Sequence, residues 1–107
     1  MHKIHFLDLK RNSQAMRSEI AAAIAEVLDS GRFILGEKVE RLEQAFARYC
    51  GAAYGIGVGS GTDALRLALL ACGVGHGHEV IAVSNTCVST VSVISSVGAT
   101  PVFADVR

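Results

Sequence analysis

The chain has 107 residues, half of them hydrophobic, which is enough for one small domain with an apolar core and too little for two. Ten Lys and Arg residues balance ten Asp and Glu residues, so no surplus of charge favours nucleic acid or an anionic membrane as a partner. We therefore expect a small-molecule ligand.

Targeting and metal signals are absent from the sequence. The N-terminal stretch carries charge throughout, and no apolar run reaches the roughly 18 residues of a membrane span, so we expect a cytoplasmic protein. The cysteines at 50, 72 and 87 form no C-x-x-C pair, which favours reduced thiols. His76 and His78 lie in a Gly-rich turn with no third ligand close in sequence, so no metal site is predicted.

Residues 1–53 are predicted to form an N-terminal arm and two helices. The arm, up to about residue 12, mixes apolar and polar residues and is expected to be extended. Ser13 then precedes apolar residues at helical spacing from Met16 to Leu28, and Gly31 is expected to end this first helix.

A second helix is predicted after the apolar linker at residues 32–36. Its apolar residues fall on one side, and most of its charged residues fall on the other, which is typical of a solvated face. Gly51 is expected to end it. Phe33 and Leu35 of the linker are compatible with burial between the two helices.

Residues 54–107 are predicted to begin an α/β domain. The expected order is a strand at 54–58, a helix at 62–72, a strand at 79–83, a helix at 88–97 and a strand at 102–106. This β-α-β-α-β alternation predicts right-handed crossovers and a mainly parallel sheet. The strand at 79–83 is a continuous apolar run of the kind that is buried on both faces. Ligands of such sheets collect at the carboxyl ends of the strands, which places residues 59–63 and 84–87 on one rim.

The glycine-rich turn before the helix at 62–72 is the candidate binding site. Glycines at 57, 59 and 61 precede Thr62 and Asp63, where the helical pattern opens. The first N–H groups of a helix have no partner within it, and glycines allow close approach, so these donors and the positive end of the helix dipole favour an anion such as phosphate.

Other glycine motifs do not fit these residues, although a purely structural interpretation does. A dinucleotide fingerprint would need its third glycine at Ser60 or Thr62, a Walker loop would need a nearby Lys, and a nucleophile elbow would need glycines two residues either side of Ser60. Ser60 or Thr62 as a plain N-cap, with the glycines making only a tight turn, explains the pattern equally well.

Five blocks of sequence, in order and across the whole chain, resemble the DegT/StrS family of pyridoxal-phosphate-dependent sugar aminotransferases, which have fold type I. The blocks are residues 6–9, 30–36, 59–65, 73–81 and 98–106. The resemblance implies that the chain is the N-terminal part of such an enzyme, with residues 54–107 forming an incomplete part of its cofactor-binding large domain.

The resemblance also implies which residues meet pyridoxal 5'-phosphate. Gly61, Thr62 and Asp63 would supply backbone donors to the phosphate, with the Thr62 hydroxyl assisting. Cys87 matches the position at which relatives usually place an aromatic residue against the pyridine ring. This is a departure from the family pattern, because a thiol offers far less contact area than Phe, Tyr or Trp.

No catalytic residue is predicted within the chain. The chemistry needs a lysine that forms a Schiff base and an acid that pairs with the pyridinium nitrogen. The lysines at 3, 10 and 38 match no such motif. The resemblance implies that both groups lie beyond position 107. We therefore expect the chain to have no transaminase activity alone. The resemblance implies that the intact enzyme is a homodimer that transfers an amino group from an amino acid, typically glutamate, to a nucleotide-linked keto-sugar. It also implies that residues 31–36 lie near the active site or the dimer contact, as an alternative to a plain linker that buries Phe33 and Leu35.

Two alternatives remain open from the sequence. One is a truncated, non-catalytic remnant that keeps a phosphate-binding module or a dimer surface without the chemistry. The other is a fragment of a sugar dehydratase of the same family, in which histidine replaces the lysine. The residue that distinguishes the dehydratase lies outside the chain.

Overall fold

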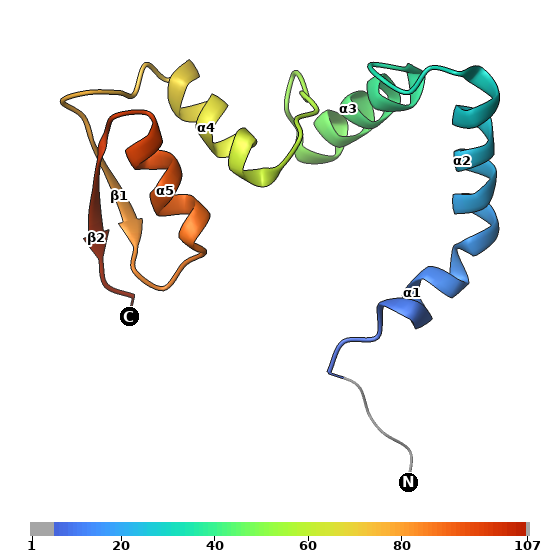
Figure 1. Cartoon of the computed structure of the whole chain (residues 1–107), viewed down its shortest axis with the longest axis horizontal. Helices are drawn as coiled ribbons and strands as arrows, with labels where there is room; N and C mark the ends of the chain where they lie inside the picture. The colour runs from blue at the N-terminus through green and yellow to red at the C-terminus, as the bar shows by residue number, and fades with distance from the viewer. Residues whose placement is uncertain (1–5, 107) are drawn as a thin grey trace, which may run out of the picture. The chain divides into compact units, whose positions relative to one another are not determined.

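A computed structural model describes residues 6–106 of the chain (Figure 1). The chain divides into two compact units, Met1–Gly55 and Ile56–Arg107. The first unit is helical and the second contains both strands and helices.

The first unit contains three helices in its described part. They are α1 (Leu9–Ala15), α2 (Arg17–Ser30) and α3 (Glu37–Cys50). The arm that we expected to be extended up to residue 12 is therefore helical from Leu9, while its residues 1–5 lie outside the described residues. The physical reason is the N-cap at Asp8, whose Oδ1 accepts the Arg11 N–H at 3.0 Å and starts a helix before Ser13.

Glycines end the two longer helices, as predicted. Gly31 (φ 64°) follows α2 and Gly51 (φ 66°) follows α3, both in the left-handed conformation that glycine adopts without strain. Between these helices the linker is exposed, with Phe33 at 68% and Leu35 at 75% exposure, so their expected burial is wrong. The reason is that burial of a linker needs another element to lie over it, and no described part of this unit covers these two side chains.

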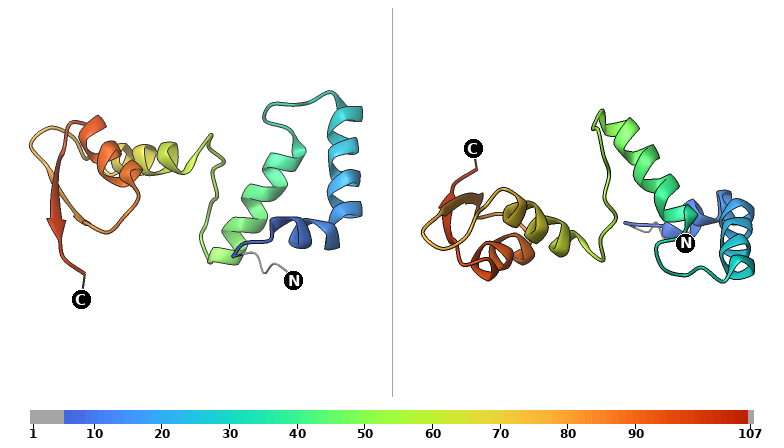
Figure 2. Two further views of the ribbon diagram at one scale, coloured as in Figure 1. Left: turned by 60° about the horizontal axis from the view of Figure 1, so that its bottom comes forward. Right: turned by 90° about the horizontal axis from the view of Figure 1, so that it is seen from above.

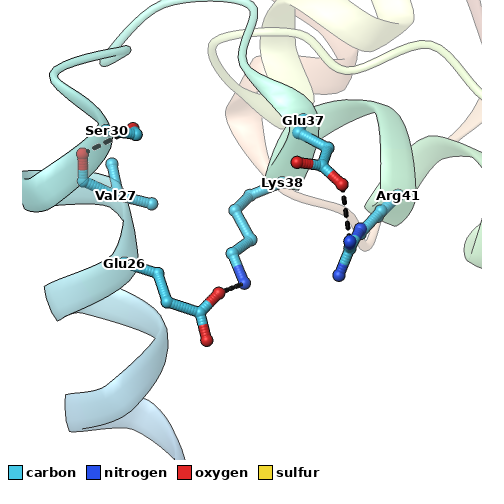
Figure 3. Close-up of polar contacts among 6 residues, drawn as sticks. All are labelled: Glu26, Val27, Ser30, Glu37, Lys38 and Arg41. Atoms are coloured by element: carbon cyan, nitrogen blue, oxygen red, sulfur yellow. Dashed lines mark hydrogen bonds and ion pairs between the residues drawn. The ribbon is translucent and has the colours of Figure 1, made fainter.

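Polar side chains join α2 to α3 (Figure 3). Lys38 Nζ of α3 forms an ion pair with Glu26 of α2, and within α3 Arg41 binds Glu37 at 2.5 Å. At the end of α2, the Ser30 hydroxyl donates to the Val27 carbonyl at 2.8 Å. The apolar contribution is small, because Ala47 is the one hydrophobic side chain that is buried among residues 6–55.

The second unit is built around a parallel strand pair with a helical crossover. It contains α4 (Gly61–Ala71), β1 (Glu79–Val83), α5 (Val88–Ser96) and β2 (Thr100–Ala104). The two strands pair in parallel from Glu79 opposite Thr100 to Val83 opposite Ala104. The views in Figures 1 and 2 show α5 against this pair, and α5 contacts both strands and α4. The predicted α/β class with a parallel sheet is therefore confirmed.

The strand predicted at 54–58 is not present. Among residues 6–106 the sheet has two strands, and residues 54–58 have no regular secondary structure. Apolar alternation makes a strand only when another strand offers its N–H and C=O groups, and none of the described residues pairs with this segment as a neighbouring strand.

The core of the second unit lies under α5. Val93 and Ile94 are each 2% exposed, and Ala99 is 6% exposed. The strand at 79–83 has the predicted boundaries, but its expected burial on both faces is wrong, because Ile81 is 75% exposed. Within the described residues of this unit, α5 packs against the strand pair, while Ile81 and Phe103 of the strands remain exposed.

Candidate functional site

The first turn of α4 is where the sequence placed the candidate phosphate site. Gly61 is the first residue of the helix, and Thr62 and Asp63 follow it in the same turn. Ser60 is the N-cap, with extended dihedral angles (φ −163°, ψ 165°) and a side chain that accepts a hydrogen bond from the Asp63 N–H at 3.1 Å. Serine is among the best residues for this position, so the sequence itself fixes where α4 begins.

Two backbone donors of this turn are left without acceptors. The Ala64 N–H donates to the Ser60 carbonyl at 3.0 Å, and the Asp63 N–H is used by the Ser60 hydroxyl. Within residues 6–106, the N–H groups of Gly61 and Thr62 have no hydrogen-bond acceptor, and both residues are exposed. This pair of donors at the positive end of a helix is suited to bind an anion.

Gly61 leaves the space in front of these donors open. A Cβ atom built on Gly61 would meet nothing within 4 Å, and Gly61 does not have a left-handed φ. Neither the packing nor the backbone conformation of the chain therefore requires glycine here. A phosphate approaching the first turn would use the space that a side chain would otherwise fill, so the residues present fit a phosphate group.

Cys87, the predicted ring-contact residue, is the N-cap of α5 and is exposed. The helix begins at Val88, as predicted, and Ser84, which follows β1, donates its N–H to the Ala104 carbonyl at 3.3 Å. The Cys87 Sγ lies 3.5 Å from the Ser89 Oγ. Hydrogen bonding with the Ser89 side chain, and then with the Ser89 backbone, lowers the pKa of the Cys87 thiol, against an opposing effect of desolvation.

The two predicted binding segments belong to helices that pack on each other. In Figure 1, α4 and α5 run in the same general direction, and they are in contact. The first turn of α4 contains the three predicted phosphate residues Gly61, Thr62 and Asp63. The Cys87 side chain instead makes its hydrogen bond within α5, to Ser89. Between α4, β1 and α5 lies an apolar cavity of about 200 Å³, which is lined by residues such as Leu65, Val80 and Val93.

Two serines contact the predicted site residues without having a predicted site role themselves. Ser60 is the N-cap of α4, and the acidic residue three positions later, which is the spacing of a capping box, is the sequence signal for its contact with Asp63. Ser89 lies two positions after Cys87, a spacing at which short polar side chains reach back to the preceding cap.

The described lysines are both remote from α4 in sequence and belong to the first unit. Lys10 is in α1, and Lys38 in α3 pairs with Glu26. Residues 6–106 contain no group of three His, Cys, Asp or Glu side chains that could hold a metal ion. In the same range, none of the helices has both the length and the hydropathy needed to cross a bilayer.

Comparisons with known proteins identify the family. Residues 14–107 match the DegT/DnrJ/EryC1/StrS aminotransferase family. The chain is 49% identical over 100 residues to dTDP-3-amino-3,4,6-trideoxy-alpha-D-glucose transaminase of Streptomyces venezuelae, covering 94% of this chain and 26% of that protein. It is 45% identical over 103 residues to UDP-N-acetyl-3-dehydro-alpha-D-glucosamine 3-aminotransferase of Acidithiobacillus ferrooxidans, covering 96% and 28%. The chain thus spans about a quarter of the length of the curated relatives that it matches.

Solved structures agree with this result. A crystal structure of S. venezuelae DesV in complex with a ketimine intermediate superposes with a TM-score of 0.96 at 46% identity, covering 100% of this chain and 29% of that chain. A crystal structure of NtdA from Bacillus subtilis with bound cofactor PMP superposes with a TM-score of 0.91 at 31% identity, covering 100% and 25%. The resemblance seen in the sequence motifs is therefore confirmed: the chain belongs to the DegT/DnrJ/EryC1/StrS aminotransferase family.

Proposed function

We propose that this chain provides the cofactor-phosphate site of a pyridoxal-phosphate-dependent sugar aminotransferase. In the whole enzyme, an amino group would pass from an amino acid, with glutamate as the expected donor, to a keto group on a nucleotide-linked sugar. The names of the relatives support this reaction class, since they include transaminases of dTDP-linked and UDP-linked sugars. A homodimer is part of the proposal and rests on the family resemblance alone.

The observation that carries the proposal is the pair of unengaged N–H groups at Gly61 and Thr62. Both donors can bind one phosphoryl group, and the Thr62 hydroxyl can add a third hydrogen bond. When bound, the cofactor supplies an electron sink for the amino acid carbon that reacts. The role of α4 is to hold and orient the phosphate group of the cofactor. This fixes the position of the pyridine ring relative to the lysine and the acid that come from outside these 107 residues.

We further propose that the lysine that bonds to the cofactor comes from polypeptide outside these 107 residues. Lys38 forms an ion pair with Glu26, and neither it nor Lys10 matches the lysine motif that the family resemblance implies. We expect borohydride reduction with pyridoxal phosphate to label no lysine of this chain stoichiometrically. A stoichiometric label on Lys38 or Lys10, read by peptide mapping, would contradict this part of the proposal.

Phosphate binding can be tested by removing one backbone donor while keeping the helix. Gly61→Pro deletes the N–H at the first helical position, where proline is well tolerated, and Ser60 already has the extended backbone that a following proline requires. We expect affinity for pyridoxamine phosphate, measured by isothermal titration calorimetry on the 107-residue chain, to fall by about tenfold or more, the equivalent of one hydrogen bond to a charged group. This probe has no aldehyde, so it does not react with surface lysines.

Two further variants complete this experiment. Thr62→Ala should weaken binding by a few-fold through loss of one hydroxyl, whereas Thr100→Ala, an exposed threonine of β2, should leave the affinity unchanged. Inorganic phosphate should compete with pyridoxamine phosphate for the site. Equal affinity in all four proteins, or no binding by the wild-type chain, would leave only the plain N-cap interpretation of this turn.

A further inference from the structure

Ser60 and Asp63 form a closed pair of hydrogen bonds in the first turn of α4. The Asp63 N–H donates to the Ser60 Oγ at 3.1 Å, and the Ser60 hydroxyl donates to the Asp63 Oδ2 at 2.9 Å. A hydroxyl has one proton, and here that proton is given to the carboxylate. Neither the Ser60 hydroxyl nor the Asp63 N–H is therefore available to donate to a phosphate oxygen.

Gly59 provides the space for the Asp63 carboxylate in this arrangement. A Cβ atom on Gly59 would lie 3.2 Å from the Asp63 Oδ2, which is closer than an ordinary contact. Gly59 does not have a left-handed φ, so its backbone conformation does not call for glycine. The carboxylate is thus held against Gly59 on one side of the cap, while the space at Gly61 stays open.

The two glycines that flank Ser60 therefore serve different purposes. A Cβ atom at Gly59 would press on a side chain of the protein, whereas a Cβ atom at Gly61 would meet nothing within 4 Å. A carboxylate near a helix N-terminus stabilises the helix through its dipole, but it has the same sign of charge as a phosphate. The hydrogen bond from Ser60 holds the Asp63 carboxylate in a fixed position, so the helix keeps the stabilising charge.

Resting on the proposed phosphate site, we propose that Asp63 is a positioning residue and not a phosphate ligand. With Ser60 and Gly59 it fixes the first turn, so that α4 offers the phosphate three donors: the N–H groups of Gly61 and Thr62 and the Thr62 hydroxyl. This assignment differs from the role that the family resemblance suggested for the Asp63 N–H, which is engaged within the turn.

Backbone amide chemical shifts during a titration with inorganic phosphate test this assignment directly. In a ¹⁵N-labelled 107-residue chain, we expect phosphate to shift the Gly61 and Thr62 amide signals strongly and the Asp63 signal little, because its hydrogen bond to Ser60 is retained. An Asp63 shift as large as that of Gly61 would overturn the assignment and leave the phosphate site itself intact. No shift at any of the three residues would instead contradict the phosphate site.

Variants of Asp63 and Gly59 separate positioning from a purely structural role. Asp63→Asn keeps an acceptor for the Ser60 hydroxyl, so it should bind phosphate at least as tightly as wild type. Asp63→Ala and Gly59→Ala disturb the pair and should bind roughly three- to tenfold more weakly, the equivalent of one ordinary hydrogen bond. Ser60→Ala removes the acceptor of the Asp63 N–H, so in that variant the amide at position 63 should join the set that phosphate shifts, which a purely structural role would not produce. Equal weakening by Asn and Ala would overturn the proposal, and the wild-type amide map decides the case if Asp63→Ala fails to fold.

Discussion

The two units of the chain differ in how their secondary structure is stabilised. In the second unit, Val93 and Ile94 of α5 are each 2% exposed, because the crossover places the helix against two paired strands. In the first unit, α2 and α3 are longer than α5, yet α2 contains no buried residue and α3 contains only Ala47. The longer helices of this protein are therefore not the ones that bury more side chains.

This difference shows which interactions act locally and which need a partner. Helices form from propensity, caps and neighbouring side chains within a few residues, and both α2 and α3 end at a left-handed glycine C-cap. Burial needs elements that are distant in sequence to meet, as β1 and β2 do across twenty-one positions of register. We expect core substitutions to dominate stability in the second unit and local interactions to dominate in the first.

The largest expected effect is that of truncating the core under α5. Ile94→Ala should lower the local free energy of unfolding of the second unit by about 3 kcal/mol, through lost burial and the cavity that remains. Leu42→Ala in α3 is the matched control. Since Leu42 is 63% exposed, its loss should cost about 0.5 kcal/mol or less. Amide hydrogen exchange reports both values in one chain. Equal losses in the two units would show that the contrast in burial has no energetic counterpart.

A smaller effect is expected from alanine at two left-handed glycines. A Cβ atom added at Gly31 (φ 64°) would have no neighbour within 4 Å, whereas one added at Gly98 (φ 85°) would lie 2.9 Å from the His76 ring. Gly31→Ala should cost about 1 kcal/mol from backbone strain alone, and Gly98→Ala about 2 kcal/mol because the ring must also move. Thermal or denaturant unfolding of the variants measures both costs.

A second substitution at His76 is the control. Adding His76→Ala should reduce the cost of Gly98→Ala to that of Gly31→Ala. A cost at Gly98 that is independent of His76 would mean that packing there adds nothing to the backbone strain.

The parts of the fold that depend on local signals could be predicted from the sequence. The ends of α2 and α3 follow from Gly31 and Gly51, and the apolar run at 79–83 has the boundaries of β1. Helix α1 does not follow from apolar spacing, because its start depends on the single N-cap residue Asp8. The strand expected at 54–58 and the burial expected at Ile81 both require a neighbouring element, which no local pattern can supply.

The candidate site divides in the same way. The helix start at Gly61 and its free donors follow from a short stretch of sequence, because a cap and the first turn are local structures. The engagement of the Asp63 N–H by Ser60 depends on which way two side chains turn, and spacing alone did not reveal it. The environment of Cys87 likewise became clear only when the structure showed that α5 starts there and that Ser89 turns back towards the thiol.

The smallest expected effect concerns the ion pair that joins α2 to α3. Hydrogen bonding from Lys38, followed by its charge and a lesser contribution from Arg41, lowers the pKa of the Glu26 carboxyl. A carboxyl whose pKa is lower in the folded state stabilises that state above its unfolded pKa, and the contribution is lost as pH falls through the folded pKa. In Lys38→Met, the pKa of Glu26, measured from its Cδ signal during an NMR titration, should rise towards the ordinary glutamate value. Arg41→Met, the control, should raise it less.

The effect of this ion pair on stability should be slight and weaker in salt, because the side chains of Lys38 and Glu26 are 40% and 63% exposed. An unchanged Glu26 titration in Lys38→Met would show that the pair does not persist in solution, and the contacts that order the first unit would then lie within its individual helices.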